Sequence, residues 1–205
     1  MSVNGVLILE CLDKRDPGSE GLFLSHMFDL MKVENQYVDV RTKEQFLNLL
    51  TSSPYKFIHI TTHGSVINGK KGERFCGLWF LDGDVKRNDL TFLEGKLRGN
   101  IIVSTACLSG GKNFSREFLK VTGCKYYIAP SGEPSFHNSI FFSHIFYHKH
   151  FILKRKVADI LVQYDKRFKN PHEFAAVSFE DYINSALVKE LTPKKSLQRM
   201  AYSHR

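Results

Sequence analysis

A histidine and a cysteine each follow an apolar segment of this 205-residue sequence. His63 comes directly after the run 57–62 (Phe-Ile-His-Ile-Thr-Thr), and Cys107 comes directly after the run 101–106 (Ile-Ile-Val-Ser-Thr-Ala). A cysteine thiol with its ordinary pKa of about 8.5 is mostly protonated at neutral pH, and a neighbouring imidazole can accept or return that proton. We therefore predict that Cys107 is a nucleophile and that His63 is its general acid–base partner.

Glycines accompany both of these residues. Gly64 has no side chain that would block a substrate, and its backbone N–H and that of Cys107 are candidates for the groups that stabilise a developing oxyanion. One such donor is worth roughly 3–4 kcal/mol of transition-state stabilisation in other enzymes. Gly110 and Gly111 allow the chain to turn away after the cysteine, which leaves the sulfur open.

The elements that must position these residues alternate along the chain. Short apolar runs that are typical of buried strands fall at 6–9, 36–40, 56–61, 100–105 and 125–129. Segments with helical spacing separate them, at 22–31, 43–50, around 90–97 and at 113–122. This alternation predicts an α/β fold with a mostly parallel sheet and helices on both faces. Because reactive groups gather at the carboxyl ends of parallel strands, His63 and Cys107 are expected to share one crevice.

One segment interrupts the alternation. Residues 64–75 contain three glycines, two lysines and an arginine, and we predict a mobile loop there, followed by a strand at 76–81. Since this loop follows His63, it is either a processing or gating loop at the crevice or simply a hairpin excursion.

The C-terminal part has helical spacing at 136–150, 154–168 and 173–190. We expect residues 1–170 to form the main domain and residues 171–205 to form a C-terminal helix and basic tail of the same domain. Residues 149–205 hold 12 basic and 6 acidic residues, so most of the formal charge of +8 lies there. Such a bias suits an acidic partner or nucleic acid, although a solvated basic helix face has the same composition, and no nucleic-acid motif accompanies it.

The composition excludes several classes of protein. With 42% hydrophobic and 24% charged residues, the chain is not intrinsically disordered. No apolar run reaches the roughly 20 residues of a membrane-spanning helix, and the first residues do not resemble a secretory signal. The four cysteines are too sparse for a disulfide framework and form no Cys-x-x-Cys pair, so we expect a cytoplasmic protein in a reducing compartment.

The two strand ends together resemble the caspase-like cysteine peptidases. Thr105-Ala106-Cys107-Leu108-Ser109-Gly110 is most similar to the Ser-Ala-Cys-x-Ser-Gly pattern of the CHAT branch, which groups relatives of caspases and separase. The intervening segment 77–83 also resembles that family's strand between the two catalytic elements, and the likeness covers about residues 6–150. It implies a three-layer sandwich around a six-stranded, mostly parallel sheet, a Cys–His dyad without metal or cofactor, and hydrolysis of a peptide bond in a protein substrate. It assigns no acidic third member to the dyad.

The resemblance has departures that bear on specificity. Relatives that prefer Arg or Lys before the scissile bond often carry Asp two places ahead of the cysteine, where this chain has Thr105. By the resemblance, Ser131, Gly132 and Glu133 belong to a substrate-lining stretch, in which Glu133 either supplies the missing negative charge or is a solvated loop residue. CHAT domains often follow helical repeats, and this sequence shows none. We therefore expect any recruiting or regulatory part to lie in a protein partner or in the C-terminal helices.

Other interpretations remain open for the same residues. Cys107 and His63 are each compatible with structural roles, and His59 is expected to pack or hydrogen-bond inside the sheet. The chain as a whole is compatible with a catalytically silent module that binds a protein or acidic partner through its basic C-terminal helices. A nucleotide-binding domain is disfavoured because no Gly-x-Gly-x-x-Gly or Walker-type loop follows the first strand. His137, His144 and His148 share a helical face, but no metal-binding motif accompanies them.

Overall fold

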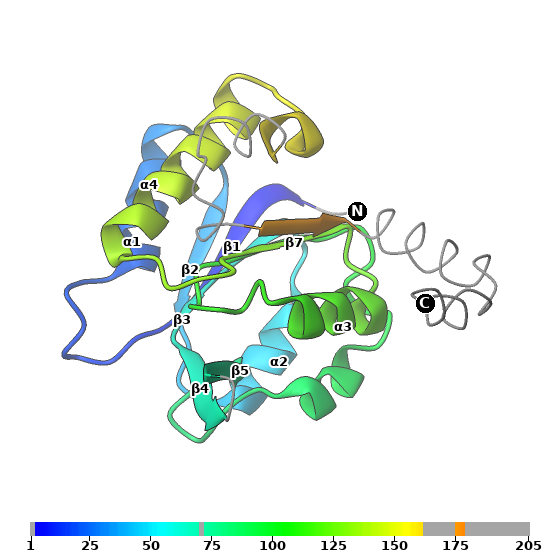
Figure 1. The fold of residues 1–205 in the computed structure, drawn as a ribbon. Coiled ribbons are helices and arrows are strands. Elements are labelled where there is room, and N and C mark those ends of the chain that lie inside the picture. Colours follow the sequence, from blue (N-terminus) through cyan, green and yellow to red (C-terminus); the bar gives the residue numbers. More distant parts are fainter. Residues whose placement is uncertain (1–2, 70–71, 162–174, 179–205) are drawn as a thin grey trace, which may run out of the picture.

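A six-stranded sheet forms the centre of the molecule. The computed structural model describes residues 3–69, 72–161 and 175–178. The strand order is β2-β1-β3-β6-β7-β8, in which the first five strands are parallel and β8 is antiparallel to β7 (Figure 1). The bounds of these strands are β1 Val3–Cys11, β2 Asn35–Asp39, β3 Tyr55–Thr62, β6 Ile101–Ser104, β7 Tyr126–Ala129 and β8 Ala175–Ser178.

Helices connect the strands and begin where the sequence provides caps. They are α1 Glu20–Leu30, α2 Lys43–Ser52, η1 Arg87–Leu93, α3 Lys112–Thr122, α4 Phe136–Tyr147 and the π-helical turn η2 His148–Ile152. The side chains of Ser19, Thr42 and Ser135 each accept a backbone N–H two or three residues into the following helix, which fixes the first turn of α1, α2 and α4. Helix α3 ends at Gly123, whose φ of 70° suits glycine.

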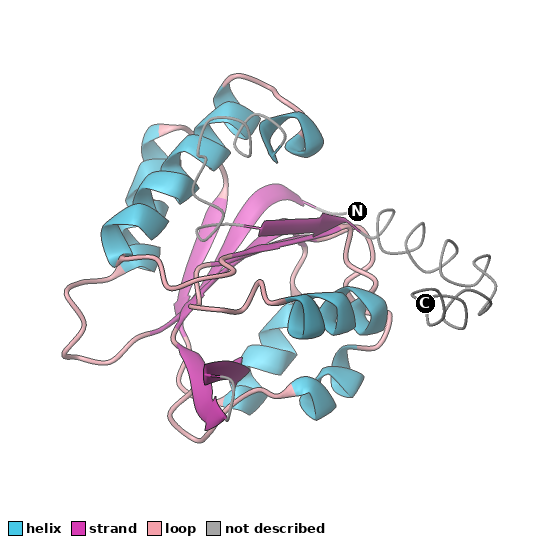
Figure 2. Ribbon diagram, viewed as in Figure 1, coloured by secondary structure: helices cyan, strands magenta, loops and turns pink. Residues whose placement is uncertain are grey.

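The helices cover both faces of the sheet, as Figure 2 shows. One face packs against α1 and α4 through residues that include Leu24, Phe28, Phe142 and Phe146. The other packs against α2, η1 and α3 through residues that include Phe46, Leu90 and Phe118. Strands buried on both sides require nearly continuous apolar sequence, as in Val6–Leu9. The predicted three-layer α/β sandwich with a mostly parallel sheet is thus confirmed.

The loop predicted at 64–75 is instead a β-hairpin, which agrees with the alternative of a hairpin excursion. β4 (Gly64–Gly69) and β5 (Gly72–Leu78) pair antiparallel as a separate two-stranded sheet. The β-branched Val66 and Ile67 lie in β4 and pair with positions in β5, and such residues favour extended backbone even between glycines. The strand predicted at 76–81 therefore begins earlier and ends at Leu78.

Two further boundaries differ from the sequence prediction. The helix expected around residues 90–97 is the 3-10 helix η1, three residues earlier. The helix expected at 154–168 begins at Val157, and Ala175–Ser178 form a strand where a helix was expected at 173–190. β8 gains backbone hydrogen bonds along the open edge of β7, a tertiary effect that helical spacing does not report. The rest of the expected C-terminal helices and tail lies outside the described residues.

Candidate active site

The predicted nucleophile and its partner follow two neighbouring strands of the sheet. His63 comes directly after β3, and Cys107 comes three residues after the end of β6. The two strands are paired, and the Thr105 N–H donates to the Ile60 carbonyl at their carboxyl ends. His63 and Cys107 line the same small cavity, of about 40 Å³. The strand pairing thus brings an imidazole and a thiol from 44 residues apart in sequence into one crevice.

Gly64 lies against the backbone of the cysteine. A Cβ atom at this position would come within 1.9 Å of the Cys107 carbonyl oxygen and 3.3 Å of its backbone nitrogen. No L-residue with a side chain fits at that separation without displacing the backbone, so the sequence requires glycine here. The backbones of the two predicted oxyanion residues are therefore adjacent.

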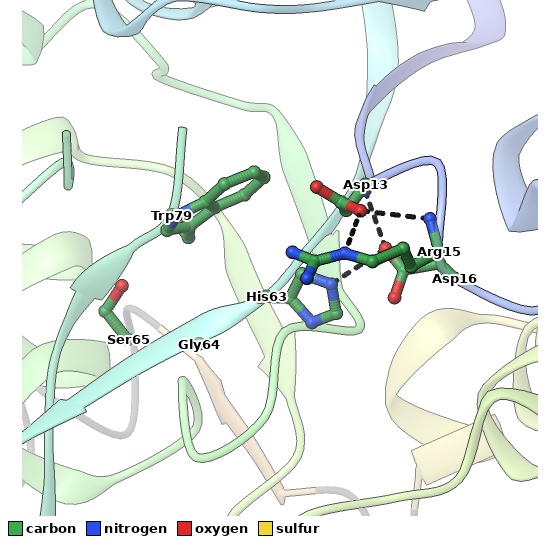
Figure 3. A pocket seen from close by; sticks show the side chains of 7 residues that line it. All are labelled: Asp13, Arg15, Asp16, His63, Gly64, Ser65 and Trp79. Carbon is green, nitrogen blue, oxygen red and sulfur yellow. Dashed lines mark hydrogen bonds and ion pairs between the residues drawn. The ribbon is translucent and has the colours of Figure 1, made fainter. Parts of the chain in front are cut away.

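The His63 imidazole is held by groups from three elements. Its Nε2 lies 2.9 Å from Oδ2 of Asp16, in the loop between β1 and α1 (Figure 3). The edges of Trp79 and Phe136 meet the ring at centroid distances of 5.9 and 6.4 Å. A hollow of about 550 Å³ lies beside the ring, lined by Asp13, Arg15, Asp16, His63, Gly64, Ser65 and Trp79.

Asp16 is a functional candidate that the sequence prediction missed. Its carboxylate also accepts the Asp13 backbone N–H at 2.6 Å, and its own N–H donates to the Asp13 carbonyl at 3.0 Å. These two bonds close a tight turn that starts just after β1. An acidic residue ahead of Pro17 and Gly18, near the carboxyl end of a strand, was the available signal, but nothing in the sequence states that this loop reaches His63.

The Cys107 thiol is half-buried and protonated in its resting form. Burial, and secondarily the negative charge of Glu133, raise the pKa of this thiol. Within the described part of the chain no hydrogen bond joins the thiol to His63. The geometry therefore supports a thiol that loses its proton in the course of reaction rather than a preformed thiolate–imidazolium pair.

The segment that follows β7 lies beside the cysteine loop. The Leu108 N–H donates to the Gly132 carbonyl at 2.8 Å, and the Gly110 N–H donates to the Pro130 carbonyl at 2.7 Å. Leu108 adopts a φ of 60°, so the chain turns sharply directly after Cys107. Ser131, Gly132 and Glu133, which were predicted to line the substrate, thus belong to a stretch tied by backbone hydrogen bonds to the loop that carries Cys107.

Thr105 is buried and contacts an unexpected carboxylate. Its hydroxyl donates to Oε2 of Glu20 at 3.0 Å, and Glu20 lines the cavity that His63 and Cys107 share. Glu20 is the first residue of α1, so a negative charge reaches this cavity from an element other than the cysteine strand. Sequence position alone gave no indication of this placement.

A second histidine lies deeper in the same strand. His59 is fully buried, with Nδ1 3.0 Å from the Tyr147 hydroxyl and Nε2 3.3 Å from Oε1 of Glu20. Glu10, on β1, is also buried and accepts the Gly21 N–H and the Tyr37 hydroxyl. These bonds give His59, Glu20 and Glu10 partners beneath the site, and the prediction that His59 hydrogen-bonds inside the sheet is confirmed.

The other three cysteines occupy different surroundings. Burial raises the pKa of Cys11 to about 11 and that of Cys124 to about 12, so both thiols are inert at neutral pH. Cys76 is half-buried, and its thiol lies 3.8 Å from Asp84. Across the described ranges, no three His, Cys, Asp or Glu side chains converge as a metal ligand set would.

Comparison with known proteins gives structural matches alone. No protein-family model and no curated protein matches the sequence. Two solved structures of a secreted C11 cysteine protease from Bacteroides thetaiotaomicron, one of them with an irreversible peptide inhibitor, superpose with TM-scores of 0.54 and 0.52 at 11% and 12% identity. They cover 92% and 91% of this chain, which in turn spans 70% and 69% of theirs.

An inactive zymogen of a C11 protease from Parabacteroides distasonis superposes with a TM-score of 0.50 at 10% identity, over 91% of this chain and 65% of that one. In the described part of the chain, no helix has the length and apolarity needed to cross a membrane. Sequence identities this low show a shared fold and no more. The chain has the caspase-like α/β fold that C11 cysteine proteases share.

Proposed function

We propose that the protein is a caspase-like cysteine endopeptidase, with Cys107 as nucleophile and His63 as general acid–base. The observation that carries the proposal is the shared cavity of His63 and Cys107, with Gly64 packed against the Cys107 backbone. The fold shared with C11 cysteine proteases supports the same reading. Protein substrates follow from this chemistry.

In the acylation step, the Cys107 sulfur attacks the scissile carbonyl carbon and its proton passes to the His63 imidazole. The carbonyl oxygen becomes an oxyanion, which we assign to the N–H groups of Gly64 and Cys107. As the C–N bond breaks, His63 gives its proton to the leaving amine, and a thioester remains on Cys107. A water molecule then attacks the thioester with His63 as base, which releases the carboxylic acid and restores the thiol.

We propose that the two hollows beside His63 and Cys107 bind different parts of the substrate. The small cavity contacts Cys107 but has a volume of only about 40 Å³, so we propose that it receives no more than the atoms next to the scissile carbonyl. The larger hollow borders His63 without Cys107 and suits the leaving segment. Glu20 lines the small cavity, and Glu133 is close enough to raise the pKa of Cys107. These two negative charges disfavour Asp or Glu before the scissile bond, and we propose neutral or basic residues there, with Thr105 contributing through its bond to Glu20.

The test is cleavage of a panel of proteins and quenched fluorescent peptides by wild type, Cys107→Ala and the matched control Cys76→Ala, each as the full chain. We expect wild type and Cys76→Ala to cleave the same bonds and Cys107→Ala to cleave none. Cleavage that persists in Cys107→Ala would show that a different group, or a contaminant, acts.

The finer family assignment rests on the motif. Thr105-Ala106-Cys107-Leu108-Ser109-Gly110 supports membership of the CHAT branch, and with it regulation by a partner protein. We also propose a cytoplasmic, reducing location, supported by four cysteines that are all free. If the protein were found outside the cell in an active form, the cytoplasmic location would be wrong, but the proposed roles of His63 and Cys107 would stand.

One observation favours a second function, a silent docking module. The Cys107 thiol is half-buried and has a raised pKa, and in the described part of the chain no hydrogen bond joins it to His63, as expected of an inert cysteine. The exposed Lys154, Arg155 and Lys156 would then provide the contact with an acidic partner. Neutralising these three residues should weaken partner binding most at low salt. An unchanged affinity would exclude this docking surface.

A further inference from the structure

We infer that Asp16 is a positioning residue for His63: its carboxylate fixes the ring orientation and keeps the proton of the neutral imidazole on Nε2, so that Nδ1 is the nitrogen available for proton transfer. The role of Nδ1 in catalysis rests on the proposed function, whereas the tautomer does not.

The contact itself determines which nitrogen carries the proton. Nε2 of His63 lies 2.9 Å from Oδ2 of Asp16. An ionised carboxylate is an acceptor only, so the imidazole must be the donor at Nε2. In the neutral ring the second nitrogen then has a free lone pair, and the nitrogen that is free to accept a proton is Nδ1.

The carboxylate is itself held in place. Oδ2 of Asp16 accepts the Asp13 N–H at 2.6 Å, and the Asp16 N–H donates to the Asp13 carbonyl at 3.0 Å. The Asp16 side chain is 14% exposed, compared with 41% for His63. The hydrogen bond is thus partly shielded from water, which makes its orientation more persistent than that of a surface ion pair.

The other neighbours of the ring cannot perform this task. Trp79 and Phe136 meet the ring in T-shaped contacts and restrict its rotation, but an aromatic edge does not choose between the two nitrogens. The Arg15 guanidinium is engaged with Asp13 at 2.8 Å and does not accept a proton. Of the groups that the described residues place around His63, the Asp16 carboxylate alone is hydrogen-bonded to a ring nitrogen.

The first test measures the tautomer directly, by two-dimensional ¹H–¹⁵N NMR of the His63 ring in the full chain carrying Cys107→Ala. At a pH where His63 is neutral, we expect the Nε2–H form with Asp16 present and a shift toward a mixture of the two forms in Asp16→Ala. Asp159→Asn, which removes an exposed charge elsewhere, is the matched control and should leave the His63 signals unchanged. An Nδ1–H ring in the parent protein, or signals that Asp16→Ala does not move, would overturn the inference.

The second test uses turnover of the best peptide found with wild type. Removing the orienting carboxylate of the Ser-His-Asp triad lowers kcat about 10⁴-fold. Because Asp16 is partly exposed, we expect Asp16→Asn to lower kcat by about 10² to 10³-fold with KM nearly unchanged, and Asp16→Glu to restore part of the loss. A thermal midpoint that falls with kcat, or a loss that appears in KM alone, would assign Asp16 a structural role instead.

The two proposals fail in different ways. If wild type cleaves nothing while NMR finds the Asp16-dependent Nε2–H form, the peptidase proposal fails and the Asp16–His63 coupling stands. If wild type cleaves substrates and Asp16→Ala retains full kcat, the peptidase stands and the positioning role is refuted.

Discussion

His59 lies in β3 and His63 directly follows it; each contacts a carboxylate, yet the two rings lie in opposite environments. The His59 ring is 0% exposed and bonds to Glu20 and the Tyr147 hydroxyl, so both of its nitrogens are engaged. The His63 ring is 41% exposed and bonds to Asp16 through one nitrogen, which leaves the other for chemistry. Each site thus pairs an imidazole with a carboxylate. Burial and an unused nitrogen distinguish the reactive candidate from the structural one.

This difference follows from position along one strand. Residues i and i+4 project from the same face, so both rings point toward α1 and the loop before it. His59 lies within the sheet beneath α1 and α4, where Phe57 and Phe28 close the core. His63 lies one residue past the end of the strand, where the sheet gives way to a hollow. The His–carboxylate pair within the sheet is therefore buried, whereas the pair at the carboxyl end of the sheet is accessible to solvent.

The largest expected effect is the loss of catalysis in His63→Ala. Without an imidazole, no group at the site accepts the thiol proton or protonates the leaving amine, and general acid–base catalysis contributes typically about 10² to 10⁴-fold. We expect kcat/KM for a peptide substrate to fall by about 10³-fold or more while the thermal midpoint stays near that of wild type, because the ring is partly exposed. A His63→Ala protein with near-normal turnover would reassign the proton transfers.

For His59→Ala we expect a large loss of stability and a small loss of turnover. This change removes a fully buried ring and leaves the Tyr147 hydroxyl and the Glu20 carboxylate without that partner. Breaking a buried, hydrogen-bonded pair costs about 3–5 kcal/mol. Urea unfolding followed by circular dichroism should show a loss of about 3 kcal/mol. Among molecules that remain folded, His59→Ala should retain turnover far above that of His63→Ala, and an equal loss of kcat in both would remove the distinction between the two histidines.

The sequence predicted the two strands that carry His63 and Cys107 better than it predicted the elements around them. The apolar runs that end at His63 and Cys107 identified the paired strands, because continuous burial on both faces leaves a clear pattern. The β4–β5 hairpin was expected only as an alternative to a mobile loop, because glycines and lysines at 64–75 obscure the short β-branched pair Val66-Ile67. β8 was missed because its backbone pairing with β7 depends on an edge formed by distant residues.

The polar partners were beyond the reach of the sequence for a related reason. Asp16 and Glu20 lie in or after the loop between β1 and α1, and their contacts with His63 and Thr105 depend on how that loop crosses the sheet. Spacing rules describe neighbours on one helix or strand, but they do not describe which loop meets which strand end. Neither acidic residue was therefore predicted to belong to the site.

Gly64→Ala tests the close approach beside His63 more gently than removal of the ring. A Cβ at 1.9 Å from the Cys107 carbonyl oxygen forces the two backbones apart. We expect kcat to fall by about 10² to 10³-fold, as for loss of one oxyanion donor, with a moderate loss of stability. The matched control is Gly83→Ala, at a turn where an added Cβ meets nothing within 4 Å, although its φ of 120° adds backbone strain. If both variants lose the same stability and the folded fraction of each keeps the kcat of wild type, the Gly64–Cys107 contact is structural only.

The smallest expected effect is a change in the pKa of the Cys107 thiol when the nearby charge of Glu133 is removed. The negative charge of Glu133 contributes to the raised pKa of Cys107, so Glu133→Gln should lower that pKa. The thiolate is the reactive form, and at any pH below the pKa a lower value means more thiolate. Alkylation of Cys107 by iodoacetamide, measured by mass spectrometry at a series of pH values, should therefore become faster in Glu133→Gln. The midpoint of the curve of alkylation rate against pH should move to lower pH. The alkylation of Cys76 in the same molecules provides the internal control, since its raised pKa comes from burial and from Asp84 and should not change. If the Cys107 midpoint moves upward or does not move, Glu133 does not face the sulfur, and its assignment to the substrate cavity fails as well.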